Sequence, residues 1–394
     1  MKFKIALYCD CNSKGGVYVF TLKMAKLFTG FGHDVIIITH AARNDFERKL
    51  KQSMAQACDR VCEVERENIG VKVAAKSIAS VINMHNVDVY IPNYRDAPFY
   101  ALHYIKNAKA IALCHNNHES YYKKLIAFDC LLDAVIFPNH QALADCERAL
   151  PEHNARYQYV PHYVDAPNVT NSDDAKNILN LIYFGRIEEE QKKIFEILKI
   201  AEYLNYKNIN FNIRVIGDGT KKDEFAEAVD VAGLSNRIEI FESMEWAELA
   251  CHISASNFNL LTSTYEGFCY SAAESMSLGV PVAAYENSAI SDYVISGVNG
   301  LVVEWGDYKG LVNNMVAAFN SDNYSLLKKN SRLHIENNFS AKSVLAGYNQ
   351  VCEDVSKNKN NKKWPVLRPK YEPKGMNIFG RLLEVLGKKA GLWR

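Results

Sequence analysis

Two glutamates in the second half of the chain flank a turn that leads into a predicted helix, where a ligand with phosphate and hydroxyl groups could bind. Glu266 and Glu274 stand eight positions apart in the string TYEGFCYSAAESMSLGVPVAA. The turn at Gly267 leads into a predicted helix, so the backbone N–H groups from Phe268 to Ser271 can face a phosphate. A carboxylate in the first turns of that helix, such as Glu274, can accept hydrogen bonds from both hydroxyl groups of a ribose.

Two basic residues could supply the positive charge for the same ligand. Arg186 and Lys192 lie six positions apart in the string YFGRIEEEQKK, at the end of a predicted strand and the start of a predicted helix. Fixed cations suit a pyrophosphate leaving group, because negative charge builds on it as the bond to it breaks. Lys193 is an alternative to Lys192. A charged surface turn would explain these residues equally well if they stood alone.

Glycines and a histidine at strand ends add further candidates. Gly15 and Gly16 precede the first predicted helix, and Gly217 ends a later strand. A glycine lets the backbone approach a phosphate or a sugar because it has no Cβ atom. His115, in the string IALCHNNHES, ends a buried strand, where it could bind a ligand or have a purely structural role.

The elements that must position these residues alternate between short apolar strands and amphipathic helices. An apolar strand, a helix and a second apolar strand form a βαβ unit with a parallel sheet. The alternation occurs before and after a polar linker at 163–177, which predicts two Rossmann-like domains. Ligands gather beyond the carboxyl ends of such strands, where His115 and Asn139 lie. The predicted strands include 4–9, 34–40, 87–93, 179–185, 211–219 and 258–263.

Taken together, these strings resemble glycosyltransferase family 4, the retaining enzymes with the GT-B fold, over roughly residues 1–348. The resemblance implies an α/β fold of two Rossmann-like, doubly wound domains with an interdomain cleft. It implies that Glu274 binds the ribose, that Glu266 and His115 face the donor sugar, and that Arg186 and Lys192 hold the diphosphate. The implied catalytic residues are His115, Glu266, Arg186 and Lys192. The implied donor-binding residues are Gly15, Gly16, Arg186, Lys192, Gly217, Glu266, Gly267, Phe268, Cys269 and Glu274.

The resemblance also implies a reaction. A hexose would move from a nucleotide diphosphate sugar, with UDP as the favoured nucleotide, to a glycan or lipid-linked glycan in bacterial surface polysaccharide or lipopolysaccharide synthesis. The chain has no Asp-x-Asp string, so we expect neither a metal nor another cofactor. Two positions depart from the family pattern, since Cys269 stands where glycine is common and His162 where asparagine is usual.

Other functions remain open at this point. A sugar-nucleotide epimerase could share the fold, and a non-catalytic nucleotide-sugar-binding protein could share the site. A Rossmann dehydrogenase is disfavoured because the first turn has Gly-Gly without Gly-x-Gly-x-x-Gly. The whole chain has a formal net charge of +1, which argues against a nucleic-acid partner.

The last part of the chain differs from the rest in charge. The sequence divides into an acceptor-binding domain at 1–168, a nucleotide-sugar-binding domain at 169–348, and a basic linker with an amphipathic helix at 349–394. Residues 357–394 could lie on an anionic membrane surface, dock on the protein or be disordered. Unpaired cysteines, with no signal peptide and no long apolar run, favour a cytoplasmic protein, free or attached to the inner face of the membrane.

Overall fold

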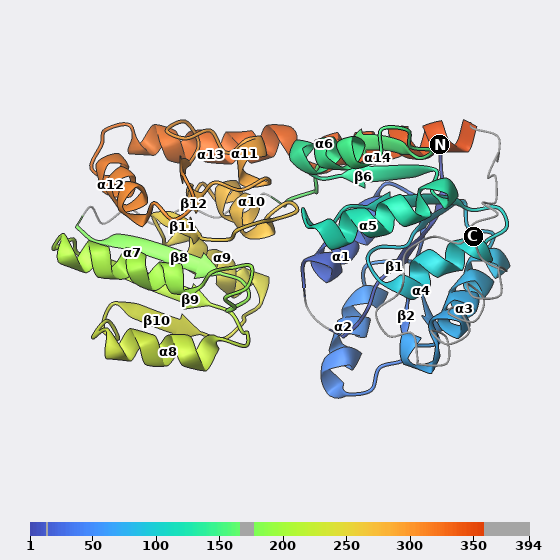
Figure 1. Ribbon diagram of the computed structural model, residues 1–394, viewed down its shortest axis with the longest axis horizontal. Coiled ribbons are helices and arrows are strands. Elements are labelled where there is room, and N and C mark those ends of the chain that lie inside the picture. The colour runs from blue at the N-terminus through green and yellow to red at the C-terminus, as the bar shows by residue number, and fades with distance from the viewer. Residues whose placement is uncertain (13–14, 166–176, 358–394) are drawn as a thin grey trace, which may run out of the picture.

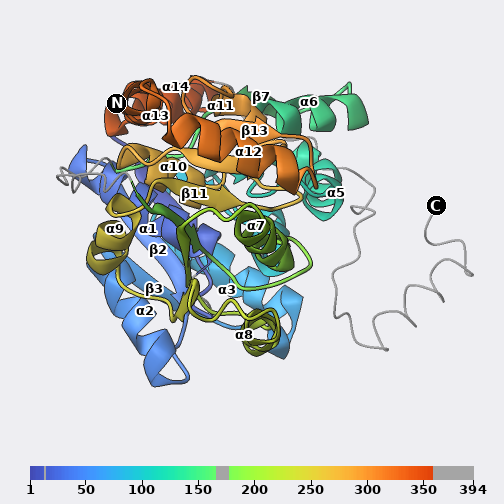
Figure 2. The same ribbon diagram turned by 90° about the vertical axis from the view of Figure 1, so that its left-hand side faces the viewer.

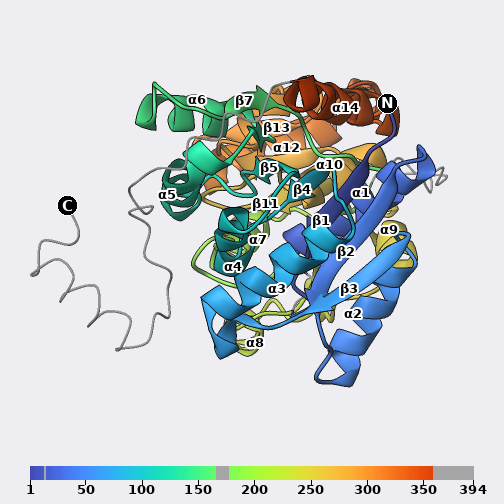
Figure 3. The same cartoon turned by 90° about the vertical axis from the view of Figure 1, so that its right-hand side faces the viewer.

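The computed structural model describes residues 1–12, 15–165 and 177–357. These residues form two parallel sheets with helices packed against them, and the two domains lie side by side (Figure 1). Figure 2 has the second domain in front and Figure 3 the first. The predicted tail at 358–394 and most of the predicted linker lie outside the described residues.

The first domain contains a parallel sheet in the strand order β3-β2-β1-β4-β5-β6-β7. Its strands are β1 Lys4–Tyr8, β2 Asp34–His40, β3 Arg60–Val64, β4 Val89–Ile91, β5 Lys109–Leu113, β6 Ala134–Phe137 and β7 Arg156–Tyr159. Its α-helices are α1 Gly16–Gly30, α2 Asp45–Ala55, α3 Val71–Met84, α4 Asp96–Tyr100, α5 Glu119–Phe128 and α6 His140–Ala149. Short 3-10 turns occur at Glu67–Ile69, Ala101–His103 and Asp129–Leu131.

The second domain repeats this arrangement in the order β10-β9-β8-β11-β12-β13. Its strands are β8 Leu179–Phe184, β9 Phe211–Ile216, β10 Ile238–Phe241, β11 Phe258–Leu261, β12 Val282–Tyr285 and β13 Leu301–Val303. Its helices are α7 Phe195–Tyr206, α8 Lys222–Val231, α9 Trp246–Ser254, α10 Tyr270–Ser277, α11 Ile290–Tyr293, α12 Tyr308–Phe319 and α13 Tyr324–Asn338. The predicted fold class of two doubly wound α/β domains is therefore confirmed.

The central strands are apolar on both faces because both faces of each sheet are covered. In β1, Ala6 and Tyr8 belong to one buried cluster, while Ile5 and Leu7 belong to another on the opposite face. The strand order reverses between β1 and β4 in the first sheet and between β8 and β11 in the second. Ligands of doubly wound sheets bind beyond the carboxyl ends of the strands at such reversals.

Helix α14, Ala341–Lys357, returns the chain to the first domain (Figure 1). His33 of the first domain bonds Asn349 across 3.1 Å, and Arg156 pairs with Asp354 at 2.6 Å. The predicted boundary between residues 348 and 349 falls inside this helix, so the structure corrects it. The physical reason is the apolar face of α14, which completes the core of the first domain with Val344, Leu345, Tyr348, Val351, Cys352 and Val355.

Candidate active site

The centre of the site is a buried ion pair at the strand-order reversal of the second domain. Lys192 Nζ lies 2.5 Å from Glu266 Oε1, and their side chains are only 15% and 9% exposed. Lys192 follows β8 and Glu266 follows β11, so neighbouring strands bring them together. Burial alone would lower the pKa of Lys192, but the Glu266 carboxylate outweighs burial and holds that pKa above its usual range. The lysine is therefore a fixed positive charge.

Arg186 reaches the same group of residues through Gln191. Its guanidinium donates to Gln191 Oε1 at 2.9 Å and pairs with Glu188 at 2.6 Å. Gln191 in turn donates to Glu266 Oε2 at 3.4 Å. The Arg186 side chain is 57% exposed, so it can turn toward a ligand while Lys192 stays fixed. Sequence reasoning did not single out Gln191, although it lies within the string that contains both cations.

The competing residue Lys193 does not join this group. It has a positive φ of 52°, and its side chain pairs with Glu189 at 3.6 Å. The structure therefore favours Lys192 over Lys193 as the buried cation, as the sequence analysis preferred.

The loop after Glu266 touches the first domain directly. A Cβ atom on Gly267 would lie 2.1 Å from the carbonyl oxygen of His115, so only glycine allows this approach. Asn139 of the first domain donates to the Gly267 carbonyl at 2.5 Å, while its own Oδ1 caps helix α6. Two predicted strand-end residues, His115 and Asn139, thus meet the Glu266 loop.

His115 is held as a neutral ring with one nitrogen still available. Asn93 donates through Nδ2 to backbone and hydroxyl oxygens, so its Oδ1 accepts from His115 Nε2 at 2.8 Å. Nδ1 of His115 therefore carries the lone pair. Burial lowers the pKa of His115 to about 3, so the ring is uncharged near neutral pH. Phe20 packs edge-on against it with ring centroids 5.1 Å apart.

The N-terminus of helix α10 has a backbone conformation that glycine adopts more readily than other residues. Cys269 caps the helix with a left-handed φ of 62°, although it has a side chain. Tyr293 donates its hydroxyl to the carbonyls of Phe268 and Cys269 at 2.9 and 3.2 Å, which fixes the turn. The Phe268 side chain is buried, so only its backbone can contact a ligand. The first N–H groups of an α-helix have no partner within the helix and favour anions.

Glu274 makes a different contact from the one that the sequence suggested for it. Its carboxylate pairs with Lys23 of helix α1 at 2.8 Å, with side chains 13% and 18% exposed. Lys23 also lies 5.0 Å from the ring centroid of Tyr270. The pair joins the two domains, and sequence analysis gave no signal for Lys23 because nothing in its local pattern differs from other helix lysines.

The predicted glycines have separate structural roles. Gly15 caps α1 and Gly16 begins it, next to residues 13 and 14, which lie outside the described residues. Gly217 has a φ of 153°, and a Cβ there would lie 1.9 Å from the Gly185 carbonyl oxygen. Gly217 thus allows the segments after β8 and β9 to run against each other, which positions the chain that carries Arg186.

His162, where the family usually has asparagine, lies between the domains. It is 3% exposed and packs against Phe20 of the first domain and against Phe268 and Tyr270 of the second. Its Nδ1 has no hydrogen-bond partner among the described residues. Burial lowers the pKa of His162 well below its usual value.

A cavity of about 540 Å³ lies between the domains beside the Glu266 loop. Its wall includes Ser288, whose hydroxyl donates to the Glu266 carbonyl at 3.2 Å. Both domains contribute residues to its wall, but none of the predicted site residues lines it. The residues around it are His140, Gln141, Ala144, Glu286, Asn287, Ser288, Ser291 and Asp292.

The described residues contain neither a metal-binding cluster nor a membrane-spanning helix. No group of three or more histidine, cysteine, aspartate or glutamate side chains in 1–12, 15–165 and 177–357 could hold a metal ion. Within the same ranges, no helix has the length and hydropathy needed to cross a membrane.

Comparison with known proteins connects this geometry to a family. Residues 166–360 match the family model described as "Glycosyl transferases group 1". This range contains every helix and strand of the second domain. The Lys192–Glu266 pair and the start of α10 both lie within the range that this model covers.

Two curated relatives of the chain are bacterial. The chain is 24% identical over 163 residues to the capsular polysaccharide biosynthesis glycosyltransferase CapM of Staphylococcus aureus, covering 41% of this chain and 42% of CapM. It is 29% identical over 135 residues to the lipopolysaccharide 1,6-galactosyltransferase of Escherichia coli, covering 33% and 37% respectively. The matched segments thus span less than half the length of these relatives.

Solved structures show that the whole fold is of the same kind as in known glycosyltransferases. TarM of S. aureus superposes with a TM-score of 0.76 at 13% identity, covering 89% of this chain and 99% of TarM. The Anabaena protein HepE in complex with UDP-glucose superposes with a TM-score of 0.73 at 16% identity, covering 90% and 100%. These neighbours establish that the two domains together form a GT-B fold.

Proposed function

We propose that the chain is a retaining glycosyltransferase that moves a hexose from a nucleotide diphosphate sugar, with UDP as the nucleotide, to a glycan or lipid-linked glycan. The observation that carries the proposal is the buried Lys192–Glu266 pair at the strand-order reversal of a group 1 glycosyltransferase domain. The similarity to CapM and to the E. coli galactosyltransferase supports a role in bacterial surface polysaccharide or lipopolysaccharide synthesis.

The proposed reaction relies on stabilising the leaving diphosphate. As the bond from the sugar to the phosphate breaks, negative charge grows on the phosphate oxygens. Lys192 and the N–H groups at the start of α10 offer positive charge and hydrogen bonds that are already in place. Arg186 is more exposed and can close on the diphosphate after it binds. In a retaining reaction, the leaving phosphate can accept the proton of the incoming hydroxyl on the same face of the sugar.

Glu266 and His115 are proposed to contact the donor sugar. The Glu266 carboxylate accepts from Lys192 and Gln191, and it can accept further hydrogen bonds from sugar hydroxyls. His115 is neutral and presents Nδ1 as an acceptor, so it binds a hydroxyl and does not serve as a cationic acid. The reaction thus depends on positioning and electrostatic stabilisation, with the closed domains excluding water.

An assay with radiolabelled UDP-hexoses tests the proposal. Transfer of label to bacterial glycan or lipid-linked acceptors, with the anomeric configuration kept, is the expected result. Conversion to an epimer without transfer would favour an epimerase, and binding without conversion would favour a non-catalytic protein. Each of these two outcomes would refute the proposed reaction. Chelation of metals with EDTA is expected to leave transfer unchanged.

Matched variants connect the assay to the site. Lys192→Met should lower the transfer rate by at least a hundredfold, because removing one group that stabilises developing charge costs about 10²–10³ in rate. Lys193→Gln is the control, since its side chain pairs with Glu189 and not with Glu266. Thermal unfolding of both variants shows whether they are folded. If the two variants have equal rates, the role assigned to Lys192 is wrong.

The basic tail suggests where the enzyme works. Residues 357–394 are proposed to bind an anionic membrane surface, which would bring the enzyme to lipid-linked acceptors on the cytoplasmic side. Support comes from the sequence alone, from its lysines, arginines and apolar residues at helical spacing. Flotation with phosphatidylglycerol vesicles, compared with phosphatidylcholine vesicles, tests it. Equal recovery of the protein with both would contradict the proposal.

A further inference from the structure

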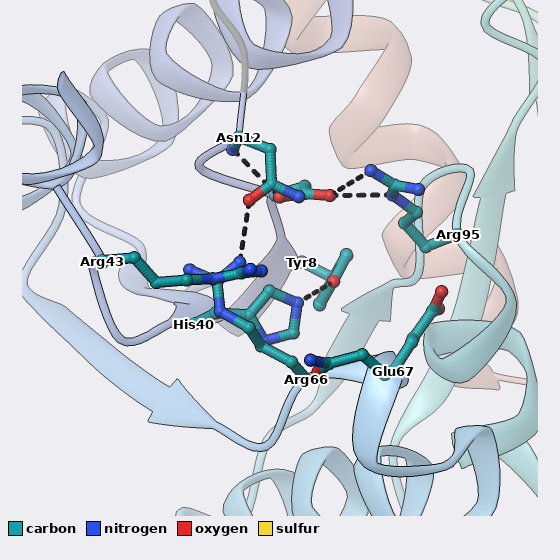
Figure 4. Close-up of a pocket in the computed structure, with 9 residues that line it drawn as sticks. Tyr8, Asn12, His40, Arg43, Arg66, Glu67 and Arg95 are labelled. Atoms are coloured by element: carbon teal, nitrogen blue, oxygen red, sulfur yellow. Dashed lines mark hydrogen bonds and ion pairs between the residues drawn. The ribbon is translucent and has the colours of Figure 1, made fainter.

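A second cavity, of about 180 Å³, lies in the first domain at the carboxyl ends of strands β1 to β4 (Figure 4). It occupies the strand-order reversal between β1 and β4, as the Lys192–Glu266 pair occupies the reversal in the second sheet. Doubly wound sheets bind ligands at this position. The lining residues are Tyr8, Asp10, Asn12, His40, Arg43, Arg66, Glu67, Asn68 and Arg95.

Every lining residue has a polar or charged group, which restricts the chemistry of the occupant. The ring of Tyr8 is buried, and its hydroxyl bonds His40 at 2.7 Å. An acyl chain in this cavity would bury little apolar area, and burial of apolar area is what stabilises a bound lipid. The cavity therefore fits a ligand covered with hydrogen-bonding groups.

Two ion pairs hold the donors and acceptors of the cavity in place. Asp10, with a side chain only 4% exposed, accepts from Arg95 Nε at 2.8 Å and from its terminal nitrogen at 2.5 Å. Arg66 pairs with Glu47 at 2.8 Å, and it also donates to Asn12 Oδ1 at 2.8 Å (Figure 4). Fixed groups of this kind bind hydroxyls with little further loss of conformational entropy.

One cation and one carboxylate oxygen of the lining are left without a partner in the described residues. The guanidinium of Arg43 makes no ion pair there, and Glu67 uses Oε1 to accept from the Ala97 N–H at 2.6 Å but leaves Oε2 unbonded. An anionic ligand would be repelled by Glu67, and a cationic ligand would be repelled by Arg43. A neutral ligand whose hydroxyls both donate and accept satisfies both residues.

The volume sets the size of the ligand. A water molecule takes about 30 Å³ of liquid volume, so 180 Å³ corresponds to roughly six waters. Such a space suits a single sugar ring.

We propose that this cavity binds one neutral monosaccharide unit of the acceptor glycan, with Glu67 and Arg43 selecting it by its hydroxyl groups. Its role as the acceptor subsite rests on the proposed transferase function, whereas sugar binding at the cavity does not. The proposal makes Glu67 and Arg43 specificity-determining residues of the first domain.

Saturation-transfer NMR on the full chain tests sugar binding without needing catalysis. The probes are methyl glycosides of glucose, galactose and mannose, with glucuronate and glucose 6-phosphate as charged counterparts. At least one neutral glycoside should bind more tightly than both charged sugars. Glu67→Gln keeps the oxygen that bonds Ala97 but loses the charge, and we expect about a tenfold weaker affinity, as for loss of one hydrogen bond to a charged group. Arg43→Gln should weaken it similarly.

Control variants and a second ligand make each outcome decisive. Glu65→Gln and Arg48→Gln alter exposed residues outside the cavity lining and should bind the glycosides like the unchanged protein. Equal affinity in Glu67→Gln and Glu65→Gln would overturn the proposal, as would tighter binding of the charged sugars than of every neutral one. UDP binding is measured in parallel. Glycoside binding without UDP binding would refute the proposed donor and leave the cavity assignment standing.

Discussion

The ion pair between Lys23 and Glu274 gives a prediction about ligand affinity. In the described structure it joins helix α1 of the first domain to helix α10 of the second at 2.8 Å. If Glu274 binds the ribose of the nucleotide, as the family resemblance implies, Lys23 competes with the nucleotide for the same carboxylate. Replacing Lys23 with methionine keeps the length of the side chain and removes the competing charge. We therefore expect Lys23→Met to bind UDP more tightly.

The size of the effect follows from the geometry of the pair. At an effective dielectric constant of about 20, two unit charges at this separation attract each other by roughly 6 kcal/mol. Desolvation offsets most of this, since the two side chains are 18% and 13% exposed. Exposed pairs contribute about 0.2–1 kcal/mol, so a coupling of about 1–2 kcal/mol is reasonable for a pair that is mostly buried. UDP should bind about 5- to 30-fold more tightly to Lys23→Met.

Isothermal titration calorimetry with UDP measures the effect in a double-mutant cycle. Glu274→Gln should bind more weakly, and the double variant should show no further gain from the Lys23 change. Lys26→Met, at an exposed position on the same helix, is the control and should match the unchanged protein. Unchanged or weaker binding in Lys23→Met would show that the ion pair does not oppose nucleotide binding, and the assignment of Glu274 would need revision.

Three further predictions concern the contact between the domains. Gly267→Ala places a Cβ atom 2.1 Å from the His115 carbonyl oxygen, so the transfer rate should fall at least tenfold. Gly30→Ala is the control and should keep the transfer rate, because a Cβ at Gly30 has no atom within 4 Å. Equal transfer rates in the two variants would show that the contact is dispensable. In urea unfolding, the free energy of unfolding of Cys269→Gly should exceed that of Cys269→Ala by about 1 kcal/mol, because alanine is strained in the left-handed conformation of this residue and glycine is not. The reverse order would contradict this reasoning. Burial lowers the pKa of His162 in the folded protein, so the unfolded chain binds a proton first as the pH drops. The free energy of unfolding should therefore fall below about pH 6.5, by up to about 1.4 kcal/mol per pH unit. His162→Phe should flatten that decline between pH 7.5 and 5 in urea unfolding, and an unaltered slope would exclude His162 as its source.

Local patterns in the chain were enough to predict most of the fold. The apolar strands at 34–40 and 179–185 appear as β2 and β8, because a strand buried on both faces must be apolar throughout. Helix length is less visible in local patterns, since α4 ends at Tyr100 and a 3-10 turn follows. The strand at 60–64 was not predicted, because β3 lies at the edge of the sheet and only its last residue, Val64, is buried.

The candidate site was predictable in part for the same reason. Arg186, Lys192 and Glu266 lie in strings whose turns and strand ends are visible in the sequence, and the structure brings them into one bonded group. The partners supplied by other parts of the chain were not predictable. Asn93 orients His115, and Lys23 pairs with Glu274 across more than two hundred residues of sequence. Only the packing of distant segments brings these partners together.

The sequence by itself determined two doubly wound domains, the strand ends at which ligands bind and the charged residues beside them, since these depend on hydropathy period and local turn chemistry. Tertiary structure decided which of these groups meet, because contacts between domains depend on how distant surfaces pack. It placed Gly267 against His115, returned α14 to the first domain and enclosed Glu67 and Arg43 around a cavity between strand ends that are far apart in the chain.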